Sequence, residues 1–183
     1  MSASDGEASM KAKLTSLYEP VTFCNFTVSH SSIDRFLSRA TCVELAVILT
    51  ALYRGRAHWN DISWSVWAHL GTLIPALALT PWILPEPKGT QRHRVLGYAW
   101  ISLMATTSLI SFNIRDLRQG KFSLIHFLSV FALQQCGMVI ATARAHNLAK
   151  HRDYIRGMIV GALLGAGFFT FPFGRILGKW LFG

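Results

Sequence analysis

Residues 62–85 read ISWSVWAHLGTLIPALALTPWILP and contain no Asp, Glu, Lys or Arg. Three further stretches lack these residues as well: 95–114, 122–143 and 157–174. An α-helix needs about 20 mostly apolar residues, within a range of roughly 17–25, to cross the hydrocarbon core of a bilayer. All four stretches have such a length. The sequence therefore predicts an all-α membrane protein with four transmembrane helices.

The connections between these stretches are short. Residues 86–94, 115–121 and 144–156 are all that joins one predicted span to the next. Connections of this size make consecutive helices antiparallel neighbours. We therefore expect residues 62–183 to form a four-helix bundle with up-down-up-down topology.

The overall composition agrees with a membrane location. Of the 183 residues only 15% are charged, and the formal net charge is +9. Soluble proteins carry about a quarter of charged residues, so this deficit argues against a large soluble enzyme. The basic residues lie in the predicted loops and helix ends, where we expect them to attract anionic lipid headgroups. No motif that combines aromatic and basic residues for nucleic-acid binding is present, so nucleic acid is not expected as a partner.

Orientation in the membrane is not decided by charge. The loops after the first and third spans carry 7 Lys and Arg residues, and the opposite side also carries 7. The positive-inside rule therefore gives a tie. No signal peptide is recognisable, which favours a multi-pass protein of an inner or cytoplasmic membrane with a cytoplasmic N-terminus.

The region before the bundle divides into two parts. Residues 1–32 are small and polar, and we expect a polar arm that is mobile or docked on another protein. Residues 33–61 have an approximately helical apolar period that Arg35, Arg39 and Glu44 interrupt. This pattern predicts an amphipathic helix at the membrane interface followed by a linker. A fifth, tilted span is the alternative.

One histidine lies at or near the N-terminal end of each predicted span. These are His69, His93, His126 and His151. Antiparallel topology places His69 and His126 near one membrane face and His93 and His151 near the other. Ionisable residues inside a membrane are expensive and are read as functional by default. Two imidazoles on facing helices can hold the iron of a b-type haem, so we take the two pairs as candidate haem ligands.

Structural explanations exist for the same residues. The two layers of histidines follow automatically if each antiparallel helix carries one histidine near its start. His93 and His151 also adjoin Arg94 and Arg152, and such pairs meet phosphates at the water interface. Gly157, Gly161 and Gly165 form a spacing that is typical of close helix packing. Gln134 and Gln135 can hydrogen-bond across helices or contact a quinone, and a quinone or a bound lipid is a further candidate ligand.

Several short motifs resemble those of a known family. They are Ala68-His69-Leu70-Gly71, Gln91-Arg92-His93-Arg94-Val95-Leu96-Gly97-Tyr98, Ile125-His126 and Lys150-His151-Arg152-Asp153-Tyr154-Ile155-Arg156-Gly157-Met158. They resemble the predicted four-helix membrane proteins called domain of unknown function 2306, over about residues 62–175. The resemblance implies a membrane location. The layout of the histidines is more loosely similar to that of transmembrane di-haem b cytochromes.

The leading hypothesis is a b-type haem electron-transfer protein of the membrane. The alternative is a non-catalytic accessory or assembly subunit of a larger respiratory or photosynthetic complex, held by other membrane subunits. Transport is a third class, which the absence of charged residues from the four predicted spans disfavours. No hydrolase, phosphate-loop or nucleotide-binding signature is present, so no catalytic residue is predicted.

Overall fold

The computed structural model describes residues 30–114, 124–172 and 175–183, and within these ranges every regular element is a helix. The elements are α2 (His30–Arg54), the 3₁₀ helix η1 (Arg56–Asp61), α3 (Trp64–Ile83), α4 (Gln91–Ser111), α5 (Leu124–Arg144), α6 (Leu148–Met158), the π-helix η2 (Ile159–Gly165), α7 (Ala166–Phe168) and α8 (Ile176–Phe182). The all-α prediction is confirmed. Residues 1–29 of the polar arm predicted over 1–32, and the whole of the connection 115–121, lie outside the described residues.

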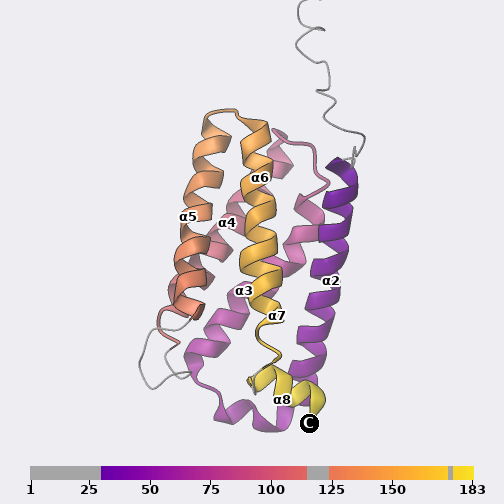
Figure 1. The fold of residues 1–183 in the computed structure, drawn as a ribbon, viewed down its shortest axis with the longest axis vertical. Helices are drawn as coiled ribbons and strands as arrows, with labels where there is room; N and C mark the ends of the chain where they lie inside the picture. Colours follow the sequence, from indigo (N-terminus) through magenta and orange to yellow (C-terminus); the bar gives the residue numbers. More distant parts are fainter. Residues whose placement is uncertain (1–29, 115–123, 173–174) are drawn as a thin grey trace, which may run out of the picture.

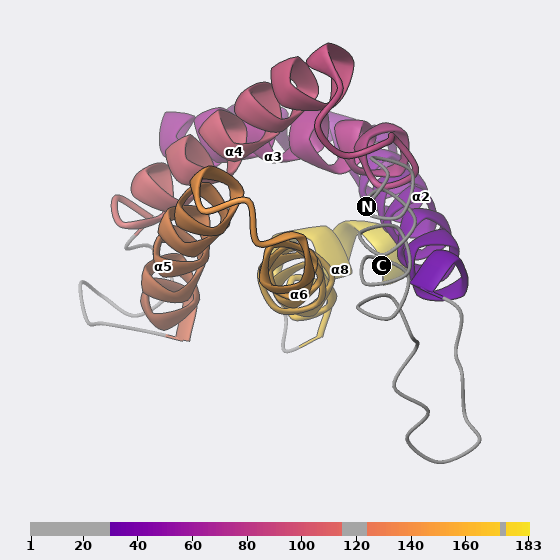
Figure 2. The same ribbon diagram turned by 90° about the horizontal axis from the view of Figure 1, so that it is seen from above.

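The last bundle helix is assembled from three elements. α6, η2 and α7 follow one another without a break, and we call them together the long helix. Figure 2 shows α2, α3, α4 and α5 as an arc, with the long helix on its concave side. The contacts agree, because α3 packs against α2 and α4, α5 packs against α4 and α6, and α2 packs against η2. The short helix α8 covers one end of the bundle beside α2 (Figure 1).

The core is held by apolar side chains and by one tryptophan that joins two helices. Trp100 on α4 is only 1% exposed, and its indole N–H donates to the carbonyl oxygen of Ala76 at 3.1 Å and to the hydroxyl of Thr80 at 3.0 Å. Buried aromatic rings contribute large apolar areas, and their polar atoms need such partners. Met158 and Ile159 bring the long helix into the same core.

Side-chain caps determine where α4 and α6 begin. The hydroxyl of Thr90 accepts a hydrogen bond from the backbone N–H of His93 at 3.1 Å. The side-chain oxygen of Asn147 accepts one from the backbone N–H of Lys150 at 3.1 Å. Thr and Asn are favoured at this position because they satisfy N–H groups that have no partner inside the helix. These caps hold His93 and His151 in the first turn or so of their helices.

Within the ranges that the structure describes, three helices are long and apolar enough to cross a membrane: Ser32–Arg54, Trp64–Ile83 and His126–Arg144. The last two coincide with the predicted spans at 62–85 and 122–143. The predicted spans at 95–114 and 157–174 are not among these three helices, and the stretch 157–174 is divided among short elements, including η2 of 7 residues and α7 of 3.

The region around α2 differs from the expected interfacial helix. α2 has 25 residues and packs along α3 and the long helix, with Leu37, Ile48 and Ala51 buried. The sequence prediction did not place a span here because it required a long run without charged residues. The exposed Arg35 and Arg39 lie in the first half of α2, and the charge further along, Glu44, has its carboxyl oxygens buried.

Candidate functional site

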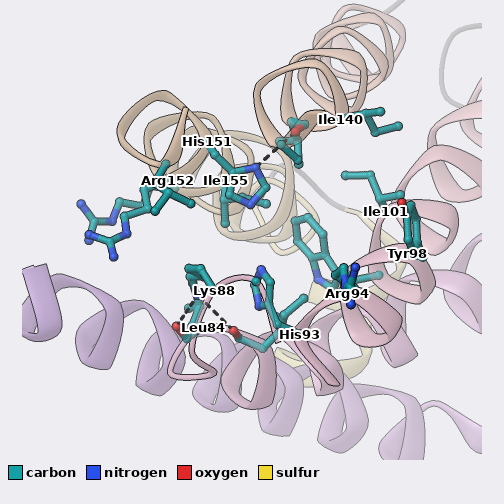
Figure 3. A pocket seen from close by; sticks show the side chains of 18 of the residues that line it. Leu84, Lys88, His93, Arg94, Tyr98, Ile101, Ile140, His151, Arg152 and Ile155 are labelled. Atoms are coloured by element: carbon teal, nitrogen blue, oxygen red, sulfur yellow. Dashed lines mark hydrogen bonds between the residues drawn. The ribbon is translucent and has the colours of Figure 1, made fainter. Parts of the chain in front are cut away.

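A cavity of about 410 Å³ opens where α3 and α5 end and where α4 and the long helix begin. We call it the His93–His151 cavity after the two imidazoles in its wall (Figure 3). Its other walls are largely apolar and include Ile83, Ile101 and Ile155. This volume falls within the range of about 300–1,000 Å³ that is usual for small-molecule sites.

The structure brings His93 and His151 together. Their ring centroids are 6.3 Å apart and their planes make an angle of 76°. Figure 3 shows the two imidazoles turned toward one another, one from α4 and one from the long helix. The two histidines are thus neighbours, as predicted. The haem that they would share stays a prediction.

Hydrogen bonding sets the protonation of His151. Its Nδ1 lies 3.2 Å from the carbonyl oxygen of Val139, which can only accept a hydrogen bond. Nδ1 therefore carries a proton, and in the neutral ring Nε2 has a free lone pair. Burial is the main cause that lowers the pKa of His151, so the neutral ring is favoured.

His93 is neutral at physiological pH for similar reasons. Burial first, and then the positive charge of Lys88 and the proximity of His151, lower its pKa to about 4. Its Nδ1 is buried and has no hydrogen-bond partner among the described residues. A buried polar atom without a partner is expensive and needs an explanation. Two neutral imidazoles with available lone pairs are what a metal ion requires of histidine.

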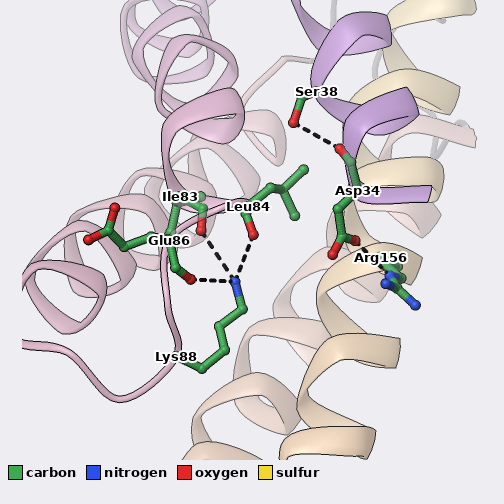
Figure 4. A network of polar contacts seen from close by, with 7 residues as sticks. All are labelled: Asp34, Ser38, Ile83, Leu84, Glu86, Lys88 and Arg156. Carbon is green, nitrogen blue, oxygen red and sulfur yellow. Dashed lines mark hydrogen bonds and ion pairs between the residues drawn. The ribbon is translucent and has the colours of Figure 1, made fainter. Parts of the chain in front are cut away.

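Lys88 closes the end of α3 beneath the cavity. Its ammonium group donates to the carbonyl oxygens of Ile83 at 3.3 Å, Leu84 at 2.9 Å and Glu86 at 3.2 Å (Figure 4). Carbonyls at a helix C-terminus lack partners within the helix and carry partial negative charge, so a cation there is stabilising. Burial lowers the pKa of Lys88. Its position explains how a positive charge comes to lie beside His93.

Further cations surround the cavity. Arg94, Arg144 and Arg152 line it, whereas Asp34 is the one acidic side chain among the described lining residues. Asp34 is engaged, because its carboxylate accepts a hydrogen bond from Arg156 at 2.9 Å, which joins α2 to the long helix (Figure 4). The cavity thus combines apolar walls, two imidazoles and an excess of positive charge. Such a site suits an amphipathic ligand with an anionic group.

The other predicted pair lies toward the opposite end of the bundle. His69 on α3 lines a second cavity, of about 220 Å³, which we call the His69 cavity. His126 on α5 is 7% exposed, packs against Phe112 with ring centroids 6.0 Å apart, and is not among the residues that line that cavity. α4 packs between α3 and α5 and contacts both. No shared cavity therefore supports this second pair in the part of the chain that is described.

The sequence analysis missed a buried carboxyl group. Both carboxylate oxygens of Glu44 are buried without a hydrogen-bond partner in the described ranges, and the carboxyl group lies against Gly167 of the long helix. Since α2 is long and apolar enough to cross a membrane, Glu44 falls within a candidate span. The four predicted spans contain no charged residue, and this absence disfavoured transport. α2, as a candidate span, does contain charged residues. The charge itself was visible in the sequence, but its burial depends on Gly167.

Comparison of the chain with protein-family models, with curated proteins and with solved structures finds no match. The resemblance to domain of unknown function 2306 therefore stays a prediction. Among the described residues, no group of three or more His, Cys, Asp or Glu side chains is placed to hold a metal ion. The His93–His151 pair can offer two protein ligands to a metal ion.

Proposed function

We propose that this protein is a b-type haem electron-transfer protein of a membrane, and that His93 and His151 would hold the haem iron. The observation that carries the proposal is the pair of neutral imidazoles, 6.3 Å apart, in one apolar-walled cavity. Haem, when bound, supplies an iron that changes between its ferrous and ferric states and so carries one electron.

The separation of the two rings would let both imidazoles hold one metal ion. With metal–nitrogen bonds of about 2.0–2.1 Å, the centroids of two imidazoles that hold one metal can lie roughly 6–6.5 Å apart.

The rest of the cavity suits the other parts of haem. The carbonyl of Val139 holds the His151 ring by its Nδ1–H, which orients the ring and raises the basicity of its other nitrogen. Ile83, Ile101 and Ile155 provide apolar walls for a macrocycle. The guanidinium groups that line the cavity can pair with the two propionates, because arginine forms charge-assisted hydrogen bonds with carboxylates.

In this proposal the four predicted spans and α2 all belong to the membrane part. α4 and the long helix run beside the three helices that meet the length and apolarity criterion (Figure 1). Their charged residues gather at the end that holds the His93–His151 cavity, where water and lipid headgroups can solvate them. A non-catalytic accessory role in a larger respiratory or photosynthetic complex is compatible with this chemistry, since a haem subunit can also be an accessory one.

The test is an optical spectrum of the full chain purified from haem-supplemented cells. We expect reduced-minus-oxidised bands of a b-type haem, at one haem per chain. His93→Ala and His151→Ala should each abolish low-spin haem, whereas the control His58→Ala, at an exposed position in η1, should keep it. A wild-type protein without these bands, or a His93→Ala and His151→Ala double variant that keeps the wild-type spectrum, would contradict the proposal.

A further inference from the structure

The His69 cavity has walls that are mainly apolar, with a cluster of polar atoms on one side. It lies between α3, α4, α5, the long helix and α8, at the opposite end of the bundle from the His93–His151 cavity. Leu70, Leu73, Met104 and Leu163 are among its apolar residues, and His69 is its imidazole. α3, which provides His69, is long and apolar enough to cross a membrane.

The hydroxyl groups near His69 donate their protons in hydrogen bonds to groups of the protein. Ser111 donates to the carbonyl oxygen of Thr107 at 2.8 Å, and Ser108 donates to that of Met104 at 2.8 Å. Thr107, also on α4, donates its hydroxyl proton to the hydroxyl of Thr72 on the facing helix α3 at 2.7 Å. A hydroxyl group has one proton and two lone pairs. Toward the cavity, Ser108 and Ser111 therefore present only acceptors.

The hydrogen bonds of Ser111 indicate the tautomer of His69. Its Nδ1 lies 2.9 Å from the hydroxyl oxygen of Ser111. If the Ser111 hydroxyl keeps its hydrogen bond to the carbonyl of Thr107, the proton in this contact comes from His69 Nδ1. The neutral ring then has its lone pair on Nε2. The imidazole thus adds one more acceptor to this side of the cavity.

A ligand that fits this side must bring its own donor. Toward α8, Arg175 and Trp180 also line the cavity and carry donors. A quinone has carbonyl oxygens and no donor, whereas a hydroquinone has two phenolic O–H groups on an apolar ring. A site built to pair a substrate O–H discriminates against the analogue that lacks it, because its own polar atoms would then be buried without partners.

We propose that the His69 cavity binds a lipid-soluble hydroquinone, with a phenolic O–H donated to Nε2 of His69, and that it prefers this reduced form to the quinone. The cavity thereby assigns the chemical class of an electron donor. That donor role rests on the proposed haem function, whereas the binding of the hydroquinone does not.

The experiment measures equilibrium binding of radiolabelled decylubiquinol and decylubiquinone to the full-length protein in nanodiscs, under argon. We expect the quinol to bind at least tenfold more tightly than the quinone, which corresponds to about 1.4 kcal/mol. His69→Phe keeps an aromatic ring without an acceptor, and it should weaken quinol binding at least tenfold while quinone binding changes little. Equal affinity of the wild-type protein for the two forms would overturn the proposal.

A second variant tests the tautomer directly. Ser111→Ala removes the acceptor that holds the proton on Nδ1, so the ring can place its proton on Nε2 and donate to a quinone carbonyl. We expect the ratio of quinol to quinone affinity to fall toward one, with the protein still folded by circular dichroism. An unchanged ratio in this variant would count against the proposal even if His69→Phe does not fold.

Two results separate this inference from the haem function. His93→Ala should lose the haem spectrum and keep quinol binding, because the residue does not line the His69 cavity. Quinol binding by a wild-type protein without haem would refute the proposed function and uphold the inference. Haem binding by a wild-type protein that does not distinguish the two forms would do the reverse.

Discussion

The carboxyl group of Glu44 lies directly against the backbone of Gly167, so that a methyl group on Gly167 would have no room. Neither carboxylate oxygen has a hydrogen-bond partner among the described residues. A glycine on the long helix therefore makes space for an ionisable group on α2.

Gly167→Ala should destabilise the protein, because the added methyl group would overlap the Glu44 carboxyl group. Overpacking of this kind costs about 1–3 kcal/mol. The measurement is thermal unfolding in detergent, and Glu44→Ala in the same chain should recover most of the loss. Gly157→Ala is the matched control, since nothing lies within 4 Å of the position of its added methyl group. Equal effects of Gly167→Ala with and without Glu44 would contradict the contact.

Acid should destabilise the haem-free protein through His93. Its pKa in the folded state is about 4, below the ordinary value of 6.5, so the unfolded chain takes up a proton at a higher pH than the folded chain does. The stability that His93 contributes is therefore complete above about pH 6.5 and is lost as the pH falls toward 4. His93→Gln should flatten the dependence of Tm on pH in this window. His58→Gln, at an exposed position of η1, is the matched control for replacing a histidine by glutamine.

Lys88→Ala should lower the stability by about 1.5–3 kcal/mol, since its charged group donates to three carbonyl oxygens at the end of α3. The variant also removes a positive charge that lowers the pKa of His93. The pH at which His93 takes up its proton should therefore rise, which NMR of the histidine C–H signals can follow. Lys150→Ala, at an exposed position on α6, is the control and should change neither quantity. A titration of His93 that does not move would show that Lys88 is not beside it.

The ion pair between Asp34 and Arg156 should couple α2 to the long helix. The two side chains are 22% and 14% exposed, and their nitrogen–oxygen distance is 2.9 Å. Asp34→Asn should cost more than Arg92→Gln, which breaks the looser pair with Glu86 at 3.8 Å and should change the stability by about 0–1 kcal/mol. A double-mutant cycle with Arg156→Gln measures the coupling. A coupling energy near zero would mean that the pair does not hold α2 in place.

The helices at 64–83 and 126–144 were predictable because a run without charges is a strong and local signal. The approach of His93 to His151 was predictable in outline, since antiparallel neighbours bring the starts of α4 and α6 to the same end. The burial of Glu44 was not, because it depends on a glycine more than a hundred residues away. The role of Lys88 was equally hidden, since a lysine in a loop does not reveal which carbonyls it will meet.

The division of the histidines was not predictable either. His69 and His126 both lie near the start of a predicted span. His69, however, is hydrogen-bonded to Ser111, whereas His126 packs against Phe112. Which neighbour each ring meets depends on how the helices are rotated, and charge-free runs carry no information on rotation. The π-helix between residues 159 and 165 adds to this, because an i to i+5 pattern shifts the face that the rest of the long helix presents.

The two cavities lie at opposite ends of the same bundle, and this separation has an electrical consequence. An electron that passed from a donor in one to an acceptor in the other would move through the field that acts across the bilayer. A full crossing is worth about 2.3 kcal/mol per charge at 100 mV. In sealed vesicles, turnover should therefore slow under a voltage of one sign and quicken when the sign is reversed. In the proposed function, electron transfer would then contribute to the membrane potential, and its rate would depend on the potential already present.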